Sequence, residues 1–112
     1  MSRITTHVLD TALGKPAVGV LVVLSVREGE IARELSRAET DADGRVRQFS
    51  TTAELTPGVY RLSFETAAYF HASARAAFFE RAQLEFRIDD LTQHYHVPLL
   101  LTPFGYTTYR GT

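Results

Sequence analysis

The sequence contains no cysteine, and this absence removes several classes of chemistry. Without thiols the chain forms no disulfide, offers no thiolate ligand to a metal and has no cysteine nucleophile. Its apolar runs are short, and none approaches the roughly 20 residues of a membrane-spanning helix. Neither sign of charge dominates, because 12 lysine and arginine residues face 13 aspartate and glutamate residues. We therefore expect no nucleic-acid partner and no membrane association.

The length and composition of the chain are typical of one globular domain. Its 112 residues are enough to bury a core without disulfides, so we expect a single domain over residues 1–112. Apolar residues make up 45% and charged residues 22%, which is the usual balance of a soluble protein. Residues 1–7 lack the apolar segment of a secretory signal, and we therefore expect a cytoplasmic protein.

Alternation of apolar and polar residues predicts β-strands in three segments. It is clearest in residues 58–65, and residues 18–27 and 84–89 show the same period of two. Turn-forming residues separate the segments, such as the Asp-Gly pair at residues 43–44. Short strands at this spacing predict an all-β fold, either a barrel or a β-sandwich of two antiparallel sheets.

One segment departs from this pattern. Residues 72–82 are rich in alanine, glutamate and arginine and contain no glycine or proline. These residues favour a helix, and the hydroxyl of Ser73 is placed to cap its first turn. We therefore predict one short helix over residues 72–82, on the outside of the sandwich.

Two histidines stand two residues apart near the end of the sequence. If residues 94–96 are extended, the imidazoles of His94 and His96 leave the same face, with Cα atoms about 6.5–7 Å apart. Three interpretations fit this spacing: an exposed pair without function, a zinc site completed by His7, or metal-free acid–base catalysis. The spacing alone does not choose among them.

Other polar side chains are candidates for binding an anion or an aromatic ring. Arg45 follows the Asp-Gly turn, and its planar guanidinium suits carbonyl or enolate oxygens. The last four residues supply the ring of Tyr109, the guanidinium of Arg110 and the hydroxyl of Thr112. Taken alone, these residues are equally consistent with a solvated arginine and a frayed chain end.

Longer sequence motifs that contain these residues favour a functional interpretation of them. They read Thr-Thr-His-Val-Leu-Asp-Thr-Ala-Leu-Gly-Lys-Pro-Ala at residues 5–17, Asp-Gly-Arg at residues 43–45, His-Tyr-His-Val-Pro-Leu-Leu-Leu-Thr-Pro-Phe-Gly-Tyr at residues 94–106 and Tyr-Arg-Gly-Thr at residues 109–112. In this order they resemble the motifs of the transthyretin-like family, and the resemblance covers nearly the whole chain. It implies a transthyretin-like β-sandwich and a homotetramer whose sites lie at the dimer–dimer interface.

Within that family, the motifs resemble the hydrolytic branch rather than the hormone carriers. The resemblance implies hydrolysis of 5-hydroxyisourate to 2-oxo-4-hydroxy-4-carboxy-5-ureidoimidazoline, in the degradation of urate to allantoin. It implies a small-molecule substrate and neither a metal nor a cofactor. Two alternatives remain: a carrier that binds a small ligand without catalysis, and a zinc hydrolase that uses its histidines as ligands.

The resemblance also assigns roles to individual positions. The implied catalytic residues are His7, Arg45, His96 and Thr112, and the residues implied to bind substrate are His7, Arg45, Tyr109 and Arg110. His94 matches the first histidine of the His-x-His motif, and the resemblance gives it no defined role. Thr112 stands where the family has serine, so it keeps the hydroxyl and adds a methyl group.

Overall fold

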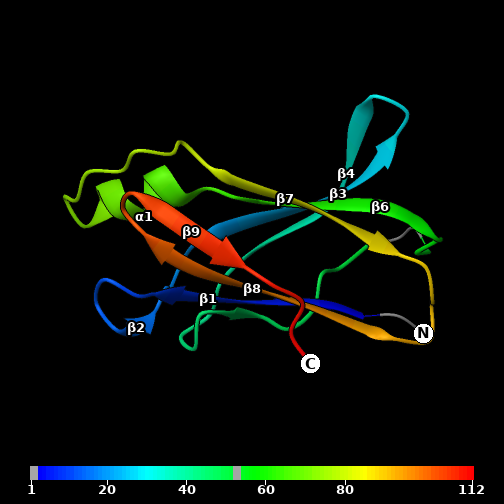
Figure 1. Cartoon of the computed structure of the whole chain (residues 1–112), viewed down its shortest axis with the longest axis horizontal. Coiled ribbons are helices and arrows are strands. Elements are labelled where there is room, and N and C mark those ends of the chain that lie inside the picture. The colour runs from blue at the N-terminus through cyan, green and yellow to red at the C-terminus, as the bar shows by residue number, and fades with distance from the viewer. Residues whose placement is uncertain (1–2, 52–53) are drawn as a thin grey trace.

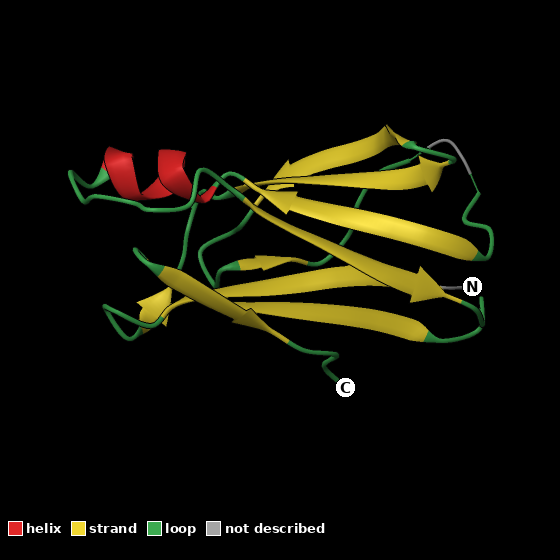
Figure 2. Cartoon of the chain, turned by 45° about the horizontal axis from the view of Figure 1, so that its top comes forward, coloured by secondary structure: helices red, strands yellow, loops and turns green. Residues whose placement is uncertain are grey.

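Two β-sheets form the computed structural model, which describes residues 3–51 and 54–112. The strands are β1 (Arg3–Asp10), β2 (Lys15–Pro16), β3 (Leu21–Glu28), β4 (Ile31–Glu39), β5 (Arg45–Val46), β6 (Gly58–Phe64), β7 (Ala82–Ile88), β8 (His94–Thr102) and β9 (Gly105–Thr108). One sheet has the order β2-β1-β8-β9, with β5 also paired to β1, and the other has the order β4-β3-β6-β7. The two sheets lie as separate layers in Figures 1 and 2.

Apolar side chains fill the space between the sheets, as the alternation predicted. On β6, Tyr60, Leu62 and Phe64 are at most 1% exposed, and the residues between them are half-buried. Leu84 and Ile88 of β7 are buried in the same way. Removing apolar surface from water is the main force that holds two such sheets together. The predicted all-β sandwich is confirmed.

The sheet that contains β1 differs from the prediction in one pairing. β1 and β8 run parallel, with Thr5 opposite His96 and His7 opposite Pro98, whereas we expected antiparallel strands throughout. A parallel pair needs a long connection, and here most of the chain lies between the two strands. The pairing places the first sequence motif directly beside the motif at residues 94–106.

The helix predicted over residues 72–82 is wrong in position. The helix of the structure, α1 (Thr66–Ala72), ends where the predicted one begins, and Ser73 is its C-cap residue. Ala74 adopts a left-handed φ of 58°, and the N–H groups of Ala74 and Arg75 bond back to carbonyls of the last turn. This arrangement terminates a helix. Among the described residues, no helix is long and apolar enough to span a membrane.

Contacts with the β8–β9 turn hold residues 73–81 in an irregular path. The N–H of Phe78 donates a hydrogen bond to the carbonyl of Pro103 at 2.8 Å. The ring of Phe79 packs edge-on against Phe78 and against Tyr106, with centroid distances of 4.9 and 5.6 Å. These tertiary contacts outweigh a helix propensity that amounts to only a few tenths of a kcal/mol per residue.

Candidate active site

A group of polar side chains lies on the outer face of the β1–β8 sheet. Because successive side chains of a strand point to opposite faces, those that alternate with the buried core residues point outward. Arg45 of β5 lies opposite His7 of β1, and Thr5 of β1 lies opposite His96 of β8. We call these residues the histidine cluster: Thr5, His7, Arg45, His94 and His96.

The turn before Arg45 is fixed by Asp41 and Gly44. The carboxylate of Asp41 accepts a hydrogen bond from the backbone N–H of Arg45 at 3.0 Å. Gly44 has a φ of 74°, and a Cβ atom there would lie 2.5 Å from the carbonyl oxygen of Val8. Only glycine fits this position, and the N–H of Val8 donates to the Gly44 carbonyl at 2.7 Å. The turn is thereby held against β1, with Arg45 beside His7.

The hydroxyl of Thr5 lies between the two imidazoles of the His-x-His motif. Its Oγ1 atom is 2.9 Å from Nε2 of His94 and 2.8 Å from Nδ1 of His96. The two rings are 6.3 Å apart between centroids. Thr5 itself is only 8% exposed, and its contacts with both rings are partly buried. When Nδ1 of His96 carries the ring proton and donates it to Thr5, Nε2 of that ring is free to accept a proton from elsewhere.

The pKa of His7 and the pKa of His96 are both lower than the ordinary value of an imidazole. Burial is the main cause for each ring, and the positive charge of Arg45 is the second. The charges of His94 and His7 lower the pKa of His96 further, whereas a hydrogen bond to the backbone of Asp43 acts in the opposite direction on His7. Both rings are therefore mainly neutral at pH 7. A neutral imidazole beside a guanidinium can act as a base next to a group that stabilises negative charge.

The segment after β9 is held against His96. The N–H of Gly111 donates to the carbonyl of His96 at 2.8 Å. A Cβ atom on Gly111 would lie 2.5 Å from Cδ2 of His96 and 3.2 Å from Cγ of Pro98, so a larger residue would displace the imidazole. The hydroxyl of Thr108 donates to the carbonyl of Pro98 at 2.8 Å. Gly111 is therefore paired with His96, and Thr112 is the next residue along the chain.

Arg110 contacts other partners. Its guanidinium carbon lies 4.7 Å from the centre of the Tyr95 ring, and Nη2 donates to Oε1 of Gln93 at 2.6 Å. Tyr95 stands between His94 and His96 in β8, so its side chain points to the opposite face of the strand. The structure therefore does not place the guanidinium of Arg110 among the histidine cluster.

A groove of about 300 Å³ lies between β7 and the C-terminal segment. His96, Tyr109 and Arg110 line it, together with residues of β7 such as Phe86. The side chain of Tyr109 is 57% exposed and is free to contact a ligand there. His96 thus takes part in both the histidine cluster and the groove, and it connects the predicted site residues of the C-terminal segment with those of β1 and β5.

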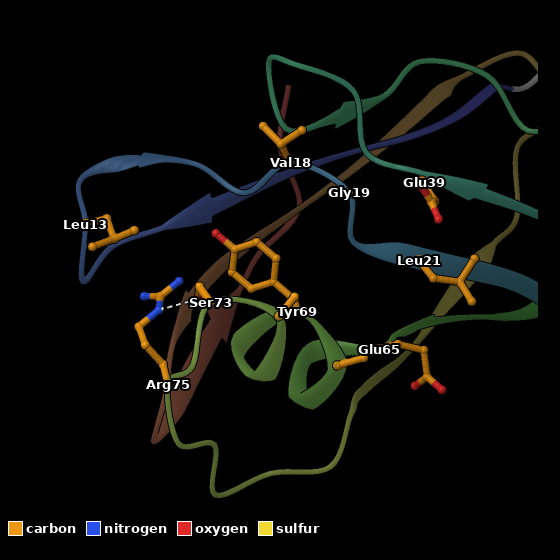
Figure 3. A pocket seen from close by; sticks show the side chains of 11 residues that line it. Leu13, Val18, Gly19, Leu21, Glu39, Glu65, Tyr69, Ser73 and Arg75 are labelled. Carbon is orange, nitrogen blue, oxygen red and sulfur yellow. Dashed lines mark hydrogen bonds between the residues drawn. The ribbon is translucent and has the colours of Figure 1, made fainter.

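A larger cavity, of about 620 Å³, lies beside α1 and is shown in Figure 3. None of the predicted site residues lines it. At its edge, Nε of Arg75 donates to the hydroxyl of Ser73 at 2.9 Å, the bond that Figure 3 marks. Nη2 of Arg75 and the hydroxyl of Tyr69 donate to Oδ2 of Asp10 at 2.7 and 2.9 Å. We call Asp10, Tyr69 and Arg75 the aspartate cluster.

The three histidines of the zinc alternative do not form a metal-ligating group. In the part of the chain that the structure describes, no three histidine, aspartate or glutamate side chains gather closely enough to hold an ion. His94 and His96 instead each direct a ring nitrogen toward the hydroxyl of Thr5. The geometry gives no support to a zinc site made of His7, His94 and His96.

The sequence interpretation missed one residue of this site, Thr5, and gave no sign of how closely Gly111 packs against His96. Thr5 lies two residues before His7, so the period of two could have placed both side chains on one face. Its contact with His96 depends on the parallel register of β1 and β8, which no local pattern indicates. Gly111 lies inside a recognised motif, but its close approach to His96 becomes visible only in the structure.

Comparison with known proteins places this site in a wider context. The sequence model of the HIUase/transthyretin family matches residues 4–111. A 5-hydroxyisourate hydrolase of Caulobacter vibrioides is 46% identical, and the alignment covers all of both chains. The structure of Klebsiella pneumoniae 5-hydroxyisourate hydrolase superposes with a TM-score of 0.86 at 43% identity, over 98% of this chain and 99% of that one.

A second solved structure has the same fold and a different ligand. Sea bream transthyretin, solved in complex with thyroxine, superposes with a TM-score of 0.90 at 30% identity, over 98% of this chain and 95% of that one. The predicted transthyretin-like sandwich is therefore confirmed. Because a hydrolase and a thyroxine-binding protein share this fold, the fold alone does not decide between catalysis and binding.

Proposed function

This chain belongs to the HIUase/transthyretin family, and we propose that it hydrolyses 5-hydroxyisourate. The product is 2-oxo-4-hydroxy-4-carboxy-5-ureidoimidazoline, on the route from urate to allantoin. The substrate is a small polar heterocycle that is opened at a ring amide. Such a reaction needs a water molecule aimed at a carbonyl, a base that takes its proton, and donors for the oxyanion that develops.

One observation carries the proposal: His7, Arg45 and His96 come together on a single sheet face. The lowered pKa of each imidazole keeps it neutral and able to accept a proton near pH 7. The adjacent guanidinium of Arg45 is suited to the negative charge of the substrate and of the transition state. A protein that only carries a ligand has no need of a base beside a cation.

We assign the central roles to these three residues. His7 and His96 position the water molecule and remove its proton, and Nε2 of His96 is the atom of that ring that Thr5 leaves available. Arg45 binds oxygens of the substrate and stabilises the oxyanion. The backbone pairing of His7 with Arg45 keeps base and cation at a fixed separation, which is what preorganised catalysis requires.

The C-terminal segment supplies the remaining groups of the proposed site. Tyr109 contacts the ring of the substrate from the groove beside His96. Thr112 donates or accepts a hydrogen bond with the water molecule or a base, in the place of the family serine. Arg110 was predicted to bind substrate, and it can do so only if its guanidinium leaves Tyr95 and Gln93.

We also propose a homotetramer whose sites lie at the dimer–dimer interface. The histidine cluster lies on an outer sheet face, because the interior of a sandwich is filled by its own side chains. Several large apolar side chains are exposed on the single chain, among them Phe104 at 70%, Leu13 at 54% and Val18 at 53%. Packing of a second subunit on these side chains would remove them from water, which favours association. The cytoplasmic location expected from the sequence stays a prediction.

The decisive test follows the ultraviolet absorbance of freshly generated 5-hydroxyisourate after exhaustive treatment of the protein with a chelator. We expect decay well above the spontaneous rate, without added metal. Decay that appears only when zinc is restored would favour the zinc hydrolase. Ligand binding without accelerated decay would favour the carrier. Sedimentation analysis during dilution tests the oligomer, because an isolated monomer with full activity would contradict a site built between subunits.

A further inference from the structure

The contact of Thr5 with two histidines has a consequence for where protons can move. Thr5 comes from β1 and the histidines from β8, and the parallel register of these strands puts all three side chains on one face. Oγ1 of Thr5 lies at hydrogen-bonding distance from Nε2 of His94, at 2.9 Å, and from Nδ1 of His96, at 2.8 Å. Thr5 is 8% exposed as a residue, and both contacts are partly buried.

A hydroxyl has one proton to donate, and this fact couples the two rings. If Thr5 donates to Nε2 of His94, it can accept only from a protonated Nδ1 of His96, and Nε2 of His96 then has a free lone pair. If Thr5 donates to Nδ1 of His96, it accepts from a protonated Nε2 of His94. As long as Thr5 donates its proton to one of the two rings, the tautomer of one imidazole determines the tautomer of the other.

We propose that Thr5 is a positioning residue that links His96 to His94 as a proton relay, an inference that rests on the proposed hydrolysis. In the resting state, Nδ1–H of His96 donates to Thr5, and Thr5 donates to Nε2 of His94, whose own proton is on Nδ1. This arrangement holds His96 in the one neutral tautomer that can act as a base through Nε2. His94, which the resemblance left without a role, is the far end of the relay.

Each proton in the relay is accounted for over one reaction cycle. As the water oxygen bonds to the substrate carbonyl carbon, one water proton moves to Nε2 of His96. The Nδ1 proton of His96 moves to Thr5, and the hydroxyl proton of Thr5 moves to Nε2 of His94, which becomes an imidazolium. When the ring C–N bond breaks, Nε2–H of His96 protonates the leaving nitrogen and the relay reverses. The water proton ends on that nitrogen, and all three side chains return to their first state.

The surroundings of His96 disfavour positive charge on that ring. The ring of His96 is half-buried, whereas His94 is exposed to water that can solvate an imidazolium. Burial is the largest cause of the lowered pKa of His96, followed by the positive charge of Arg45 from β5 and then by His94 from β8 and His7 from β1. A proton that arrives on His96 is therefore poorly held there. Transfer through Thr5 moves the charge into solvent.

The spectroscopic test is an NMR titration of the ring nitrogens in the full chain without substrate. In the wild-type protein, protonation of His94 should switch the proton of His96 from Nδ1 to Nε2 while that ring stays neutral. In Thr5→Val the same protonation should leave the tautomer of His96 unchanged. An unchanged tautomer of His96 in the wild-type protein, or an identical switch in Thr5→Val, would overturn the relay.

The kinetic test uses a set of matched variants. Thr5→Val should lower kcat about tenfold with little change in KM, because the relay acts on proton transfer rather than on binding. Thr5→Ser restores the hydroxyl and should restore kcat. Thr11→Val removes a hydroxyl from the same part of the chain, where it bonds to Leu101 rather than to a histidine, and should leave kcat unchanged.

His94→Gln gives an independent route in case Thr5→Val folds poorly. It leaves Thr5 in place and removes the final proton acceptor, so it should lower kcat to the same extent. The double variant should be no slower than either single variant, since both interrupt one pathway. Additive losses, or a kcat of Thr5→Ser as low as that of Thr5→Val, would contradict the relay. Failure of the wild-type protein to hydrolyse 5-hydroxyisourate would contradict the proposed function instead, and the titration decides the coupling separately.

Discussion

Strand β1 contributes polar side chains to two clusters that have opposite electrostatic character. In the aspartate cluster, Asp10 is fully buried and its charge is neutralised by Arg75 and satisfied by the hydroxyl of Tyr69. In the histidine cluster, the charges that act on His96 are all positive. One cluster is complete within the chain. In the other, the nearby carboxylates of Asp41 and Asp43 pair with Arg47, and the guanidinium of Arg45 on the outer face of the sheet is available to an anionic ligand.

The pKa of Asp10 and the pKa of His96 are both lowered, but for different physical reasons. Burial raises the pKa of Asp10, but the hydrogen bonds from Arg75 and Tyr69 outweigh it and the pKa is lowered. Burial lowers the pKa of His96, and the neighbouring positive charges lower it further. The chain thus stabilises the charged form of Asp10 and the neutral form of His96. The charged form of Asp10 contributes to folding stability, and the neutral form of His96 remains available as a base.

The largest effect should come from Arg45→Ala, which removes the cation of the histidine cluster. We expect the rate of 5-hydroxyisourate hydrolysis to fall about 10²–10³-fold, the usual cost of losing one oxyanion donor. The melting temperature should change little, because Arg45 lies on the outer face. The exposed Arg33 of β4 offers a matched control, since Arg33→Ala removes an equal charge away from the site. A loss below tenfold in Arg45→Ala would remove Arg45 from the mechanism.

In the aspartate cluster we expect a substitution to lower stability and to leave activity nearly unchanged. Asp10→Ala removes the carboxylate that accepts bonds from Arg75, Tyr69 and the N–H of Leu13. We expect the free energy of unfolding to fall by about 3 kcal/mol, the lower end of the cost of breaking a buried ion pair, because Arg75 can turn toward water. Denaturant unfolding measures this loss. Activity per folded molecule should stay close to wild type, and a selective loss of activity would show that the two clusters are coupled.

The two clusters also differ in how well the sequence predicted them. His7, Arg45 and His96 were identified because each lies in a short motif with a recognisable spacing. The pairing of Asp10 with Arg75 joins residues 65 positions apart, and no local pattern indicates it. The bridging role of Thr5 was missed for the same reason, because it depends on the register between β1 and β8.

The strands were predicted better than the helix because the alternation that indicates a strand lies within the strand itself. Alternation along β6 follows directly from one buried face and one half-buried face. The helix at Thr66–Ala72 was displaced in the prediction, since residues 73–81 have high helix propensity and are held instead by contacts with the β8–β9 turn. Those contacts come from a segment about 25 residues further along the chain, which local propensity does not include.

A smaller effect should follow from Gly111→Ala, which tests how tightly the histidine cluster is packed. A methyl group at this position would lie 2.5 Å from Cδ2 of His96, so the ring or the C-terminal segment must move. We expect hydrolysis to slow by about tenfold, because displacement of a catalytic group by a fraction of an ångström is costly. Gly105→Ala is a useful comparison, since its Cβ would come no closer than 3.7 Å to another atom, Oγ1 of Thr102, and its backbone is not left-handed. Equal activity in both variants would show that the position of His96 is not critical.

The smallest expected effect is on how folding stability depends on pH. The two clusters should lose their contributions to stability in different pH ranges. The folded pKa of His96 lies below the unfolded value of about 6.5, so the unfolded chain binds a proton first as the pH falls. The stability that His96 contributes is present above about pH 6.5 and is lost as the pH falls from there through the folded pKa.

Asp10 follows the same rule in a lower window. Its contribution is present above the unfolded carboxyl pKa of about 3.9 and is lost only as the pH falls through its lower folded value. His96→Gln should therefore flatten the dependence of unfolding free energy on pH just below pH 6.5, and Asp10→Asn should flatten it only below about pH 4. Denaturant unfolding at a series of pH values measures both slopes. If both substitutions changed the same pH range, the two clusters would titrate as one system, and their division into a structural and a catalytic group would fail.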